Sequence, residues 1–325
     1  MQINRRSICQ LAALSAITPV AWANSGAYPN KPLKTIVPFP PGGGGDTLSR
    51  LVLNKVSEEL KQTIVIENLP GAGGNLGAAA AARAQADGYT LLYGTNGTHA
   101  INSSLYKKTG FDPLKDFEPV SRLTEIAAIV AVRADLPVST VKELIEYSRK
   151  STNQLSFGSA GNGTTSHLAG EMFKQVTGVN WMHVPYKGGA AALTDLMAGR
   201  IDVLIDVAPN VGPHVAAGRI KALAVTTKER VKAFDKLPTV LESGVPGYVV
   251  TAWDGLFVPA RTDAAIVSQL TAAVLAALKN PELKAQLEAR VATPSPLSNG
   301  QFRNFIVAET QRWAEVVKKS GASVD

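Results

Sequence analysis

Two glycine-rich loops carry the residues whose types and spacing point to binding chemistry. The first occupies residues 42–46 (GGGGD) and the second residues 158–166 (GSAGNGTTS). Each is expected between a strand and a helix, where the first backbone N–H groups of the helix lack partners and attract an anion. Two such loops, one in each half of the chain, predict an anion gripped between them. A tight turn capped by Asp46 would also explain the first loop.

Several single residues are further candidates for the same site. The polar loop at residues 94–99 (GTNGTH) supplies Asn96 and His99, and His99 either faces a cleft or packs within the loop. Asp206 ends an apolar strand, where a buried acid needs a partner or a ligand that donates a hydrogen bond. Trp253 fits a core position better than a platform for a ligand.

Motifs of enzymes and nucleotide-binding proteins do not fit the chain. No Lys-Ser or Lys-Thr follows the glycines, and Thr47 and Leu76 stand where a dinucleotide fingerprint needs glycine. There is no Gly-x-Ser-x-Gly elbow, and the four histidines lack His-Glu-x-x-His spacing. His167 and Glu171 are four apart on an expected helix, where a surface pair is favoured over a metal site. We therefore expect no catalytic residues, no metal and no cofactor.

Strand-like apolar runs alternate with helical patterns, which predicts an α/β fold with largely parallel sheets. The expected strands are residues 34–39, 63–67, 89–94, 126–132, 155–158, 182–185, 201–207, 220–226 and 256–259. The expected helices are residues 47–60, 76–84, 140–150, 166–177, 190–198, 264–278, 281–289 and 299–320. Residues 95–102 read as a polar loop.

Two similar runs of strands and helices, without a long linker, predict two lobes. We place residues 24–125 and 228–325 in lobe 1 and residues 126–227 in lobe 2. The chain would cross between the lobes near residues 122–126 and 226–228.

The N-terminus reads as an export signal over residues 1–23. Arg5 and Arg6 precede the apolar residues 8–20, and Ala-Trp-Ala at 21–23 is a small-x-small cleavage site. The apolar run is too short to span a bilayer. Export would follow the Sec route, or the twin-arginine route because the two arginines are adjacent. Cys9, the only cysteine, would leave with the signal.

The mature chain would carry 31 basic and 26 acidic residues, a net charge of +5. The basic residues are scattered among acids and form no stripe with aromatic residues, so no nucleic-acid partner is expected. A mild positive field favours encounters with anionic ligands, and it also serves solubility.

Six short motifs make the chain resemble the substrate-binding proteins of tripartite tricarboxylate transporters, the Bug family. They are residues 37–43 (VPFPPGG), 68–75 (NLPGAGGN), 87–92 (DGYTLL), 159–164 (SAGNGT), 183–188 (HVPYKG) and 237–240 (LPTV). The resemblance covers nearly the whole mature chain, and together these motifs are far more specific than a lone glycine motif.

The resemblance implies a type II periplasmic binding protein fold, in which two α/β lobes close on a ligand in the cleft between them. It implies a periplasmic protein that captures a small carboxylate and delivers it to membrane permease subunits. We expect a monomer. The implied ligand contacts are Phe39, Gly43, Gly44, Gly45, Asp46 and Thr47 in one lobe, and Ser159, Ala160, Gly161, Asn162, Thr164 and Asp206 in the other. Asn96 and His99 join them from the polar loop.

The sequence also departs from the family pattern. Asp254 stands where an apolar or aromatic residue is usual, and Val207 and Ala208 replace a more polar pair. These departures leave the ligand open among dicarboxylates, tricarboxylates, aromatic acids, amino acids and nicotinate-like compounds. Two other functions stay open: a sensing module that presents its closed form to a membrane receptor, and a periplasmic enzyme that uses His99 and Asp206.

Overall fold

The computed structural model describes residues 28–320 and 322–324. The export signal predicted at residues 1–23, with Cys9, lies outside the described residues. Within the described part, no helix combines the length and the apolar composition needed to cross a membrane.

The described chain alternates strands and helices, as its sequence predicts. The strands are β1 (Leu33–Val37), β2 (Ile64–Asn68), β3 (Thr90–Thr95), β4 (Phe117–Arg133), β5 (Ser156–Ser159), β6 (Met182–Pro185), β7 (Val203–Val207), β8 (Ile220–Val225), β9 (Thr251–Pro259) and β10 (Ala292–Leu297). The α-helices are α1 (Gly44–Leu60), α2 (Asn75–Ala82), α3 (Asn102–Leu105), α4 (Val141–Lys150), α5 (Thr165–Thr177), α6 (Gly189–Met197), α7 (Ala208–Ala216), α8 (Ala264–Leu278), α9 (Pro281–Glu288) and α10 (Asn299–Ser320). Short 3₁₀ turns lie at Ala72–Gly74 and Lys232–Phe234, and a π-helical turn at Gly97–Ile101.

The strand order is β2-β1-β3-β9-β4-β7-β5-β6, with β8 and β10 also paired to β4. The pairs β2–β1, β1–β3, β7–β5 and β5–β6 are parallel, whereas β3–β9, β9–β4 and β4–β7 are antiparallel. The prediction of largely parallel sheets therefore holds for the outer strands and not for the middle.

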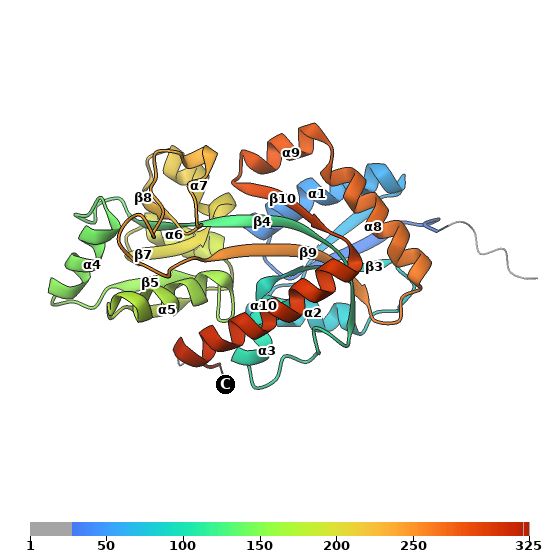
Figure 1. Cartoon of the computed structure of the whole chain (residues 1–325), viewed down its shortest axis with the longest axis horizontal. Helices are drawn as coiled ribbons and strands as arrows, with labels where there is room; N and C mark the ends of the chain where they lie inside the picture. Colours follow the sequence, from blue (N-terminus) through green and yellow to red (C-terminus); the bar gives the residue numbers. More distant parts are fainter. Residues whose placement is uncertain (1–27, 321, 325) are drawn as a thin grey trace, which may run out of the picture.

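Strand β4 joins two groups of elements. Its residues up to Ala127 pair with β9, and those from Ala128 onward pair with β7. Figure 1 shows β4 and β9 crossing the middle of the molecule between the two groups. In one group α1, α8 and α9 lie on one side of the strands, and α2, α3 and α10 on the other; the second group contains α4 to α7 (Figure 1). The lobe boundaries given above stay a prediction.

Several elements differ from expectation. Strand β4 begins at Phe117, nine residues earlier than predicted, and α7 and β10 were not predicted. The segment predicted as a polar loop is helical from Gly97 onward. Its residues His99 and Ile101 are completely buried, and α10 packs against this turn. The composition of residues 97–102 favours a loop, but packing against α10 buries the segment and stabilises a helical conformation.

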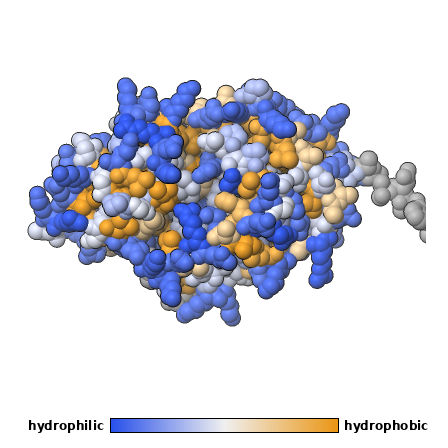
Figure 2. Space-filling view, in the orientation of Figure 1, coloured by the Kyte–Doolittle hydropathy of each residue, from blue (hydrophilic) through white to orange (hydrophobic). Residues whose placement is uncertain are grey.

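Buried faces follow the sequence periodicity. Leu48, Val52 and Val56, four residues apart on α1, are buried, as expected for an amphipathic helix on a core. They belong to the same apolar cluster as Val267 and Leu270 of α8. On the face shown in Figure 2, apolar patches are interrupted by hydrophilic side chains.

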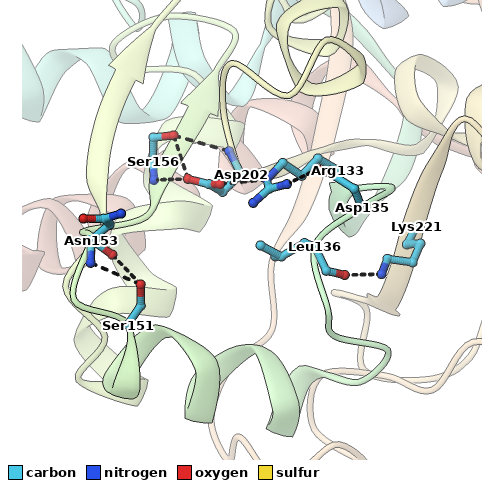
Figure 3. Close-up of polar contacts among 8 residues, drawn as sticks. All are labelled: Arg133, Asp135, Leu136, Ser151, Asn153, Ser156, Asp202 and Lys221. Carbon is cyan, nitrogen blue, oxygen red and sulfur yellow. Dashed lines mark hydrogen bonds and ion pairs between the residues drawn. The ribbon is translucent and has the colours of Figure 1, made fainter.

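A polar network fixes the end of the second group of elements. Asp202 accepts hydrogen bonds from Arg133 Nε at 2.9 Å and from the Ser156 backbone N–H at 2.9 Å. Arg133 also pairs with Asp135, at 2.5 Å. Figure 3 shows these side chains meeting where β4 ends and β5 begins. None of these residues lines the cavity described below.

Candidate functional site

A cavity of about 300 Å³ lies where the two groups of elements meet. Three helices begin at its wall: α1 at Gly43–Gly45, α5 at Thr164–Ser166, and α6 at Gly188–Ala191. The free N–H groups of a helix start carry partial positive charge. Their convergence makes the cavity suited to an anion.

The first glycine loop is braced from behind by Asp46. Its carboxylate accepts hydrogen bonds from the Gly42 N–H at 2.9 Å, Arg50 Nε at 3.0 Å and Asn68 Nδ2 at 2.8 Å. Burial opposes ionisation, but the hydrogen bonds from Arg50, Gly42 and Asn68 lower the pKa of Asp46. Asn68 also donates to the Phe39 carbonyl at 2.9 Å. Because no side chain caps α1 at Gly43, its first N–H groups stay available.

The second loop is held by its own hydroxyl groups. Thr164 caps α5 and donates from Oγ1 to the Gly161 carbonyl at 2.6 Å. Ser166 Oγ accepts from the Ala160 N–H at 2.8 Å. Ser159 Oγ accepts from the Gly161 N–H at 3.2 Å. These bonds fix the loop backbone around the start of the helix.

Two stacked histidines support this loop. The rings of His167 and His183 lie 4.2 Å apart; His183 Nε2 contacts Ser159 Oγ at 2.7 Å, and His167 Nδ1 accepts from the Gly163 N–H at 3.3 Å. Burial lowers the pKa of His167 to about 3 and that of His183 to about 4, so both are neutral at pH 7. A neutral His167 is required for it to accept the Gly163 hydrogen bond.

Asn96, which directly precedes the π-helical turn at Gly97–Ile101, is 1% exposed. Its Oδ1 accepts from Thr165 Oγ1 at 2.8 Å, and its Nδ2 has no hydrogen-bond partner among the described residues. Asn96 lines the cavity. A buried amide without a partner is costly, and a ligand acceptor would satisfy it.

Asp206 is the carboxylate on the cavity wall. Asn210 Nδ2 donates to it at 2.7 Å. Burial raises the pKa of Asp206 to about 6, against the opposing hydrogen bonds from Val207 and Asn210. A β-carbon added to Gly189 would lie only 2.4 Å from Asp206 Oδ2, so glycine is needed where α6 meets this acid.

The strands form the rest of the wall. Phe39 follows β1, Tyr93 lies on β3, Ile126 on β4, and Trp253 on β9. Trp253 is both buried and part of the cavity wall. Asp254, beside it, is not on the wall but bonds the Tyr93 hydroxyl.

Contacts across the cleft hold the two groups of elements together. Tyr106 donates its hydroxyl to the Asn162 carbonyl at 2.7 Å. A β-carbon on Gly73 would lie 2.2 Å from the same carbonyl oxygen, and one on Gly44 would lie 2.8 Å from a methyl group of Val207. The two groups of elements are therefore in direct contact beside the cavity.

The sequence-predicted residues fall into three groups. The first lines the cavity: Phe39, Gly43, Gly44, Gly45, Asn96, Ala160, Thr164 and Asp206. Gly161 and Asn162 instead line a neighbouring cavity of about 180 Å³, which also contacts Phe39 and Lys187. Four residues lie on neither wall: Asp46, Thr47, Ser159 and His99.

His99 differs most from its expected place. It is fully buried, and its ring stacks on Phe257 with 3.7 Å between ring centres. Burial lowers its pKa to about 3. Because His99 lines neither cavity, the structure disfavours the enzyme that pairs His99 with Asp206.

Sequence reasoning missed the third helix start. Lys187 and residues 188–191 line the cavity, as do Tyr93, Thr165 and Ser166. The signal was present, because a strand, a glycine pair and a helix follow one another at residues 182–197, as in the two loops that were identified.

His167 and Glu171, the pair considered for a metal site, do not contact each other through an ion pair. Glu171 forms an ion pair with Lys174 at 3.0 Å rather than with His167. The described residues hold no cluster of His, Cys, Asp and Glu arranged to bind a metal ion.

Comparisons with known proteins agree with this geometry. Residues 48–322 match the family described as the tripartite tricarboxylate transporter family receptor. The structure of Rpa4515 from R. palustris with adipate is 38% identical, with a TM-score of 0.89 over 91% of this chain and 99% of that one. The periplasmic binding protein BugD is 34% identical, with a TM-score of 0.88 over 91% and 99%. MatC from Rhodopseudomonas palustris, with bound malate, is 34% identical, with a TM-score of 0.85 over 89% and 100%. The chain has the two-lobed α/β fold of these proteins.

Proposed function

The chain belongs to the tripartite tricarboxylate transporter receptor family, and we propose that it captures a small carboxylate in the periplasm by closing its two lobes. It then delivers this ligand to the membrane permease of such a transporter. Its lobes are residues 24–125 with 228–325, and residues 126–227. The periplasmic location rests on the family and on the export signal predicted from the sequence.

One observation carries this proposal: three helix starts converge on one cavity, whose wall also contains the Asn96 amide without a hydrogen-bond partner among the described residues. All of these groups are hydrogen-bond donors, and no arginine lines the cavity in the described chain. Backbone donors at helix starts hold carboxylates well. Relatives with bound adipate and malate favour the same ligand class.

We propose direct ligand contacts from the residues of the cavity wall and supporting roles for those behind it. The contacts come from the N–H groups of Gly44, Gly45 and Thr165 and from Asn96. Asp46 and Ser159 hold the two loops in place. Gly161 and Asn162 close the cleft beside the ligand.

Calorimetry with the purified mature protein tests the proposal. A library of mono-, di- and tricarboxylates should contain an acid that binds, whereas the amide of that acid should not. In cells, deletion of the gene should abolish uptake of that acid and leave uptake of an unrelated nutrient unchanged. Failure of every acid to bind would contradict carboxylate capture.

Asn96→Asp probes the site itself. The variant keeps the acceptor that Thr165 uses, but replaces the free donor with a negative oxygen that repels a carboxylate. We expect Kd to rise by on the order of 100-fold, a loss typical of a charge left unpaired at a buried site. Asn280→Asp makes the same change at the start of α9, where the side chain only caps the helix, and should leave Kd unchanged. Equal affinity of both variants would contradict the placement of the carboxylate at Asn96.

A further inference from the structure

The wall made by β3, β4 and β9 is largely apolar, and its hydroxyl-bearing residues are Tyr93 and Thr95, both on β3. Ile126, Ala252 and Trp253 line it, and the Trp253 indole N–H is engaged by Glu309 at 2.9 Å. Tyr93 lines the same wall. Of the two hydroxyl-bearing residues, Tyr93 is the one whose hydroxyl is bonded to a buried carboxylate behind the wall.

Asp254 lies behind Tyr93 and determines what that hydroxyl can do. Asp254 is 1% exposed. Its Oδ1 accepts from the Thr124 backbone N–H at 2.9 Å and from Thr124 Oγ1 at 2.7 Å, and its Oδ2 accepts from the Tyr93 hydroxyl. The register of β4 against β9 shifts between Arg122 and Thr124, next to the backbone N–H group that bonds this side chain.

The protonation states of Tyr93 and Asp254 agree with a hydrogen bond donated by the Tyr93 hydroxyl to the Asp254 carboxylate. Burial raises the pKa of Asp254 to about 6, so the group is mostly ionised at pH 7 and acts as an acceptor. Burial and the neighbouring Asp254 raise the pKa of Tyr93 well above its usual value, so the phenol keeps its proton. A phenol has one proton to donate, and here Asp254 takes it.

We infer that Asp254 fixes the Tyr93 oxygen as a hydrogen-bond acceptor at the cavity, so that the ligand is a carboxylate that also carries a hydroxyl or ammonium donor. This inference rests on the proposed function and narrows its ligand class. Asp206 is a second acceptor on the wall, with Asn210 as its side-chain donor. A ligand without a donor would leave the Tyr93 oxygen without a donor and would add no donor to Asp206, which costs affinity. Asp254 is a positioning residue that acts through Tyr93.

Matched ligand sets with equal carbon skeletons test the inference. Succinate, malate and aspartate differ only by hydrogen, hydroxyl or ammonium at one carbon; glutarate, 2-hydroxyglutarate and glutamate, and adipate and 2-aminoadipate, repeat the comparison at greater lengths. We expect calorimetry to show about tenfold or greater preference for a donor-bearing acid in the set that fits the cavity. Tyr93→Phe removes the acceptor. In this variant the ratio of the Kd of the unsubstituted acid to that of the donor-bearing acid should fall close to one.

Asp254→Asn gives a sharper result. The amide oxygen of the new side chain would face the two Thr124 donors, and its NH₂ group would face Tyr93. The Tyr93 proton would then turn toward the cavity, and the preference should reverse in favour of the unsubstituted acid. A purely structural role for Asp254 would weaken all acids alike.

Tyr248→Phe is the matched control, because Tyr248 is also buried but donates its hydroxyl to the Ala169 carbonyl away from the cavity. It should leave the ratio unchanged, and circular dichroism establishes that each variant folds. Equal binding of substituted and unsubstituted acids by the unaltered protein, or a preference that survives Tyr93→Phe, would overturn the inference and leave carboxylate capture standing. Absence of binding by every acid would overturn both.

Discussion

Two buried carboxylates, Asp206 and Asp254, bind their protons more tightly in the folded protein than an exposed carboxyl group does. Burial raises the pKa of each to about 6. Each is held by hydrogen bonds, to Asn210 in one case and to Thr124 and Tyr93 in the other, rather than by a positive charge. Ionisation of a buried carboxyl group without a positive partner lowers the stability of the folded state. Such groups therefore concentrate at functional sites, where a ligand can interact with the charge.

The Asp206 carboxyl group therefore predicts a pH dependence of stability. Its pKa rises on folding from the model-peptide value of 3.8 to about 6. The folded state binds the proton more tightly, so the free energy of unfolding falls as pH rises from about 4 to about 6. A shift of about two pKa units corresponds to roughly 3 kcal/mol at most.

Asp206→Asn should remove this contribution, so the stability of the variant relative to the unaltered protein should increase between pH 4 and pH 6. Urea unfolding without ligand across this range measures it. Glu59→Gln, on the exposed face of α1, controls for the loss of one negative charge. A stability difference for Asp206→Asn that does not change with pH would refute the shift.

At the scale of elements, strands end in two different ways. Strand β1, and residues 182–185 of β6, lead into glycine turns at the cavity, where helices begin with free N–H groups. The outer ends of β4 and β5 are instead tied to each other through Asp202, away from the cavity (Figure 3). The strand ends at the cavity thus support ligand binding, and the outer ends of β4 and β5 support stability.

Asp202→Ala should separate these two roles. The variant loses the hydrogen bonds from Arg133 and Ser156 and should lower the free energy of unfolding by about 1–3 kcal/mol, because a partly buried network is left unsatisfied. Ligand Kd should stay the same. Thermal unfolding and calorimetry measure the two quantities, and a raised Kd at unchanged stability would contradict the separation.

At the scale of the whole molecule, closure depends on close approach of backbones across the cleft. Gly73 and Asn162 meet with no room for a side chain, and Tyr106 bonds the same carbonyl. Thr165 and Asn96 form a second contact across the cleft. The proposed function predicts that ligand binding and lobe closure are coupled through these contacts.

Gly73→Ala should hold the lobes apart. Its β-carbon would lie 2.2 Å from the Asn162 oxygen, so we expect at least about tenfold weaker binding and a larger radius of gyration with saturating ligand, measured by small-angle scattering. Gly178→Ala is the control, since Gly178 has a similar positive φ of 73° but no atom within 4 Å of the added carbon. If both variants lose affinity to the same extent, backbone strain rather than blocked closure explains the loss. If neither loses affinity, close approach at Gly73 is not needed for binding.

Much of the fold was predictable because its signals are local. The apolar spacing of Leu48, Val52 and Val56 identifies a helix and its buried face, and a glycine turn after a strand identifies a helix start. The first half of β4 was missed, since Phe117 to Glu125 shows no alternation of its own and is ordered by pairing with β9, more than 120 residues later.

The sequence by itself determined the two glycine loops, the α/β character and the family resemblance, because short motifs and periodicity depend on neighbours along the chain. Only the tertiary structure decided which side chains face the ligand. Asp46 turns away from the cavity because Arg50 and Asn68 hold it, and His99 is buried because Phe257 covers its ring. Tyr93 became a candidate acceptor only when folding brought it against Asp254, 161 residues further along. Side-chain direction and charge depend on such distant contacts, which no local pattern records.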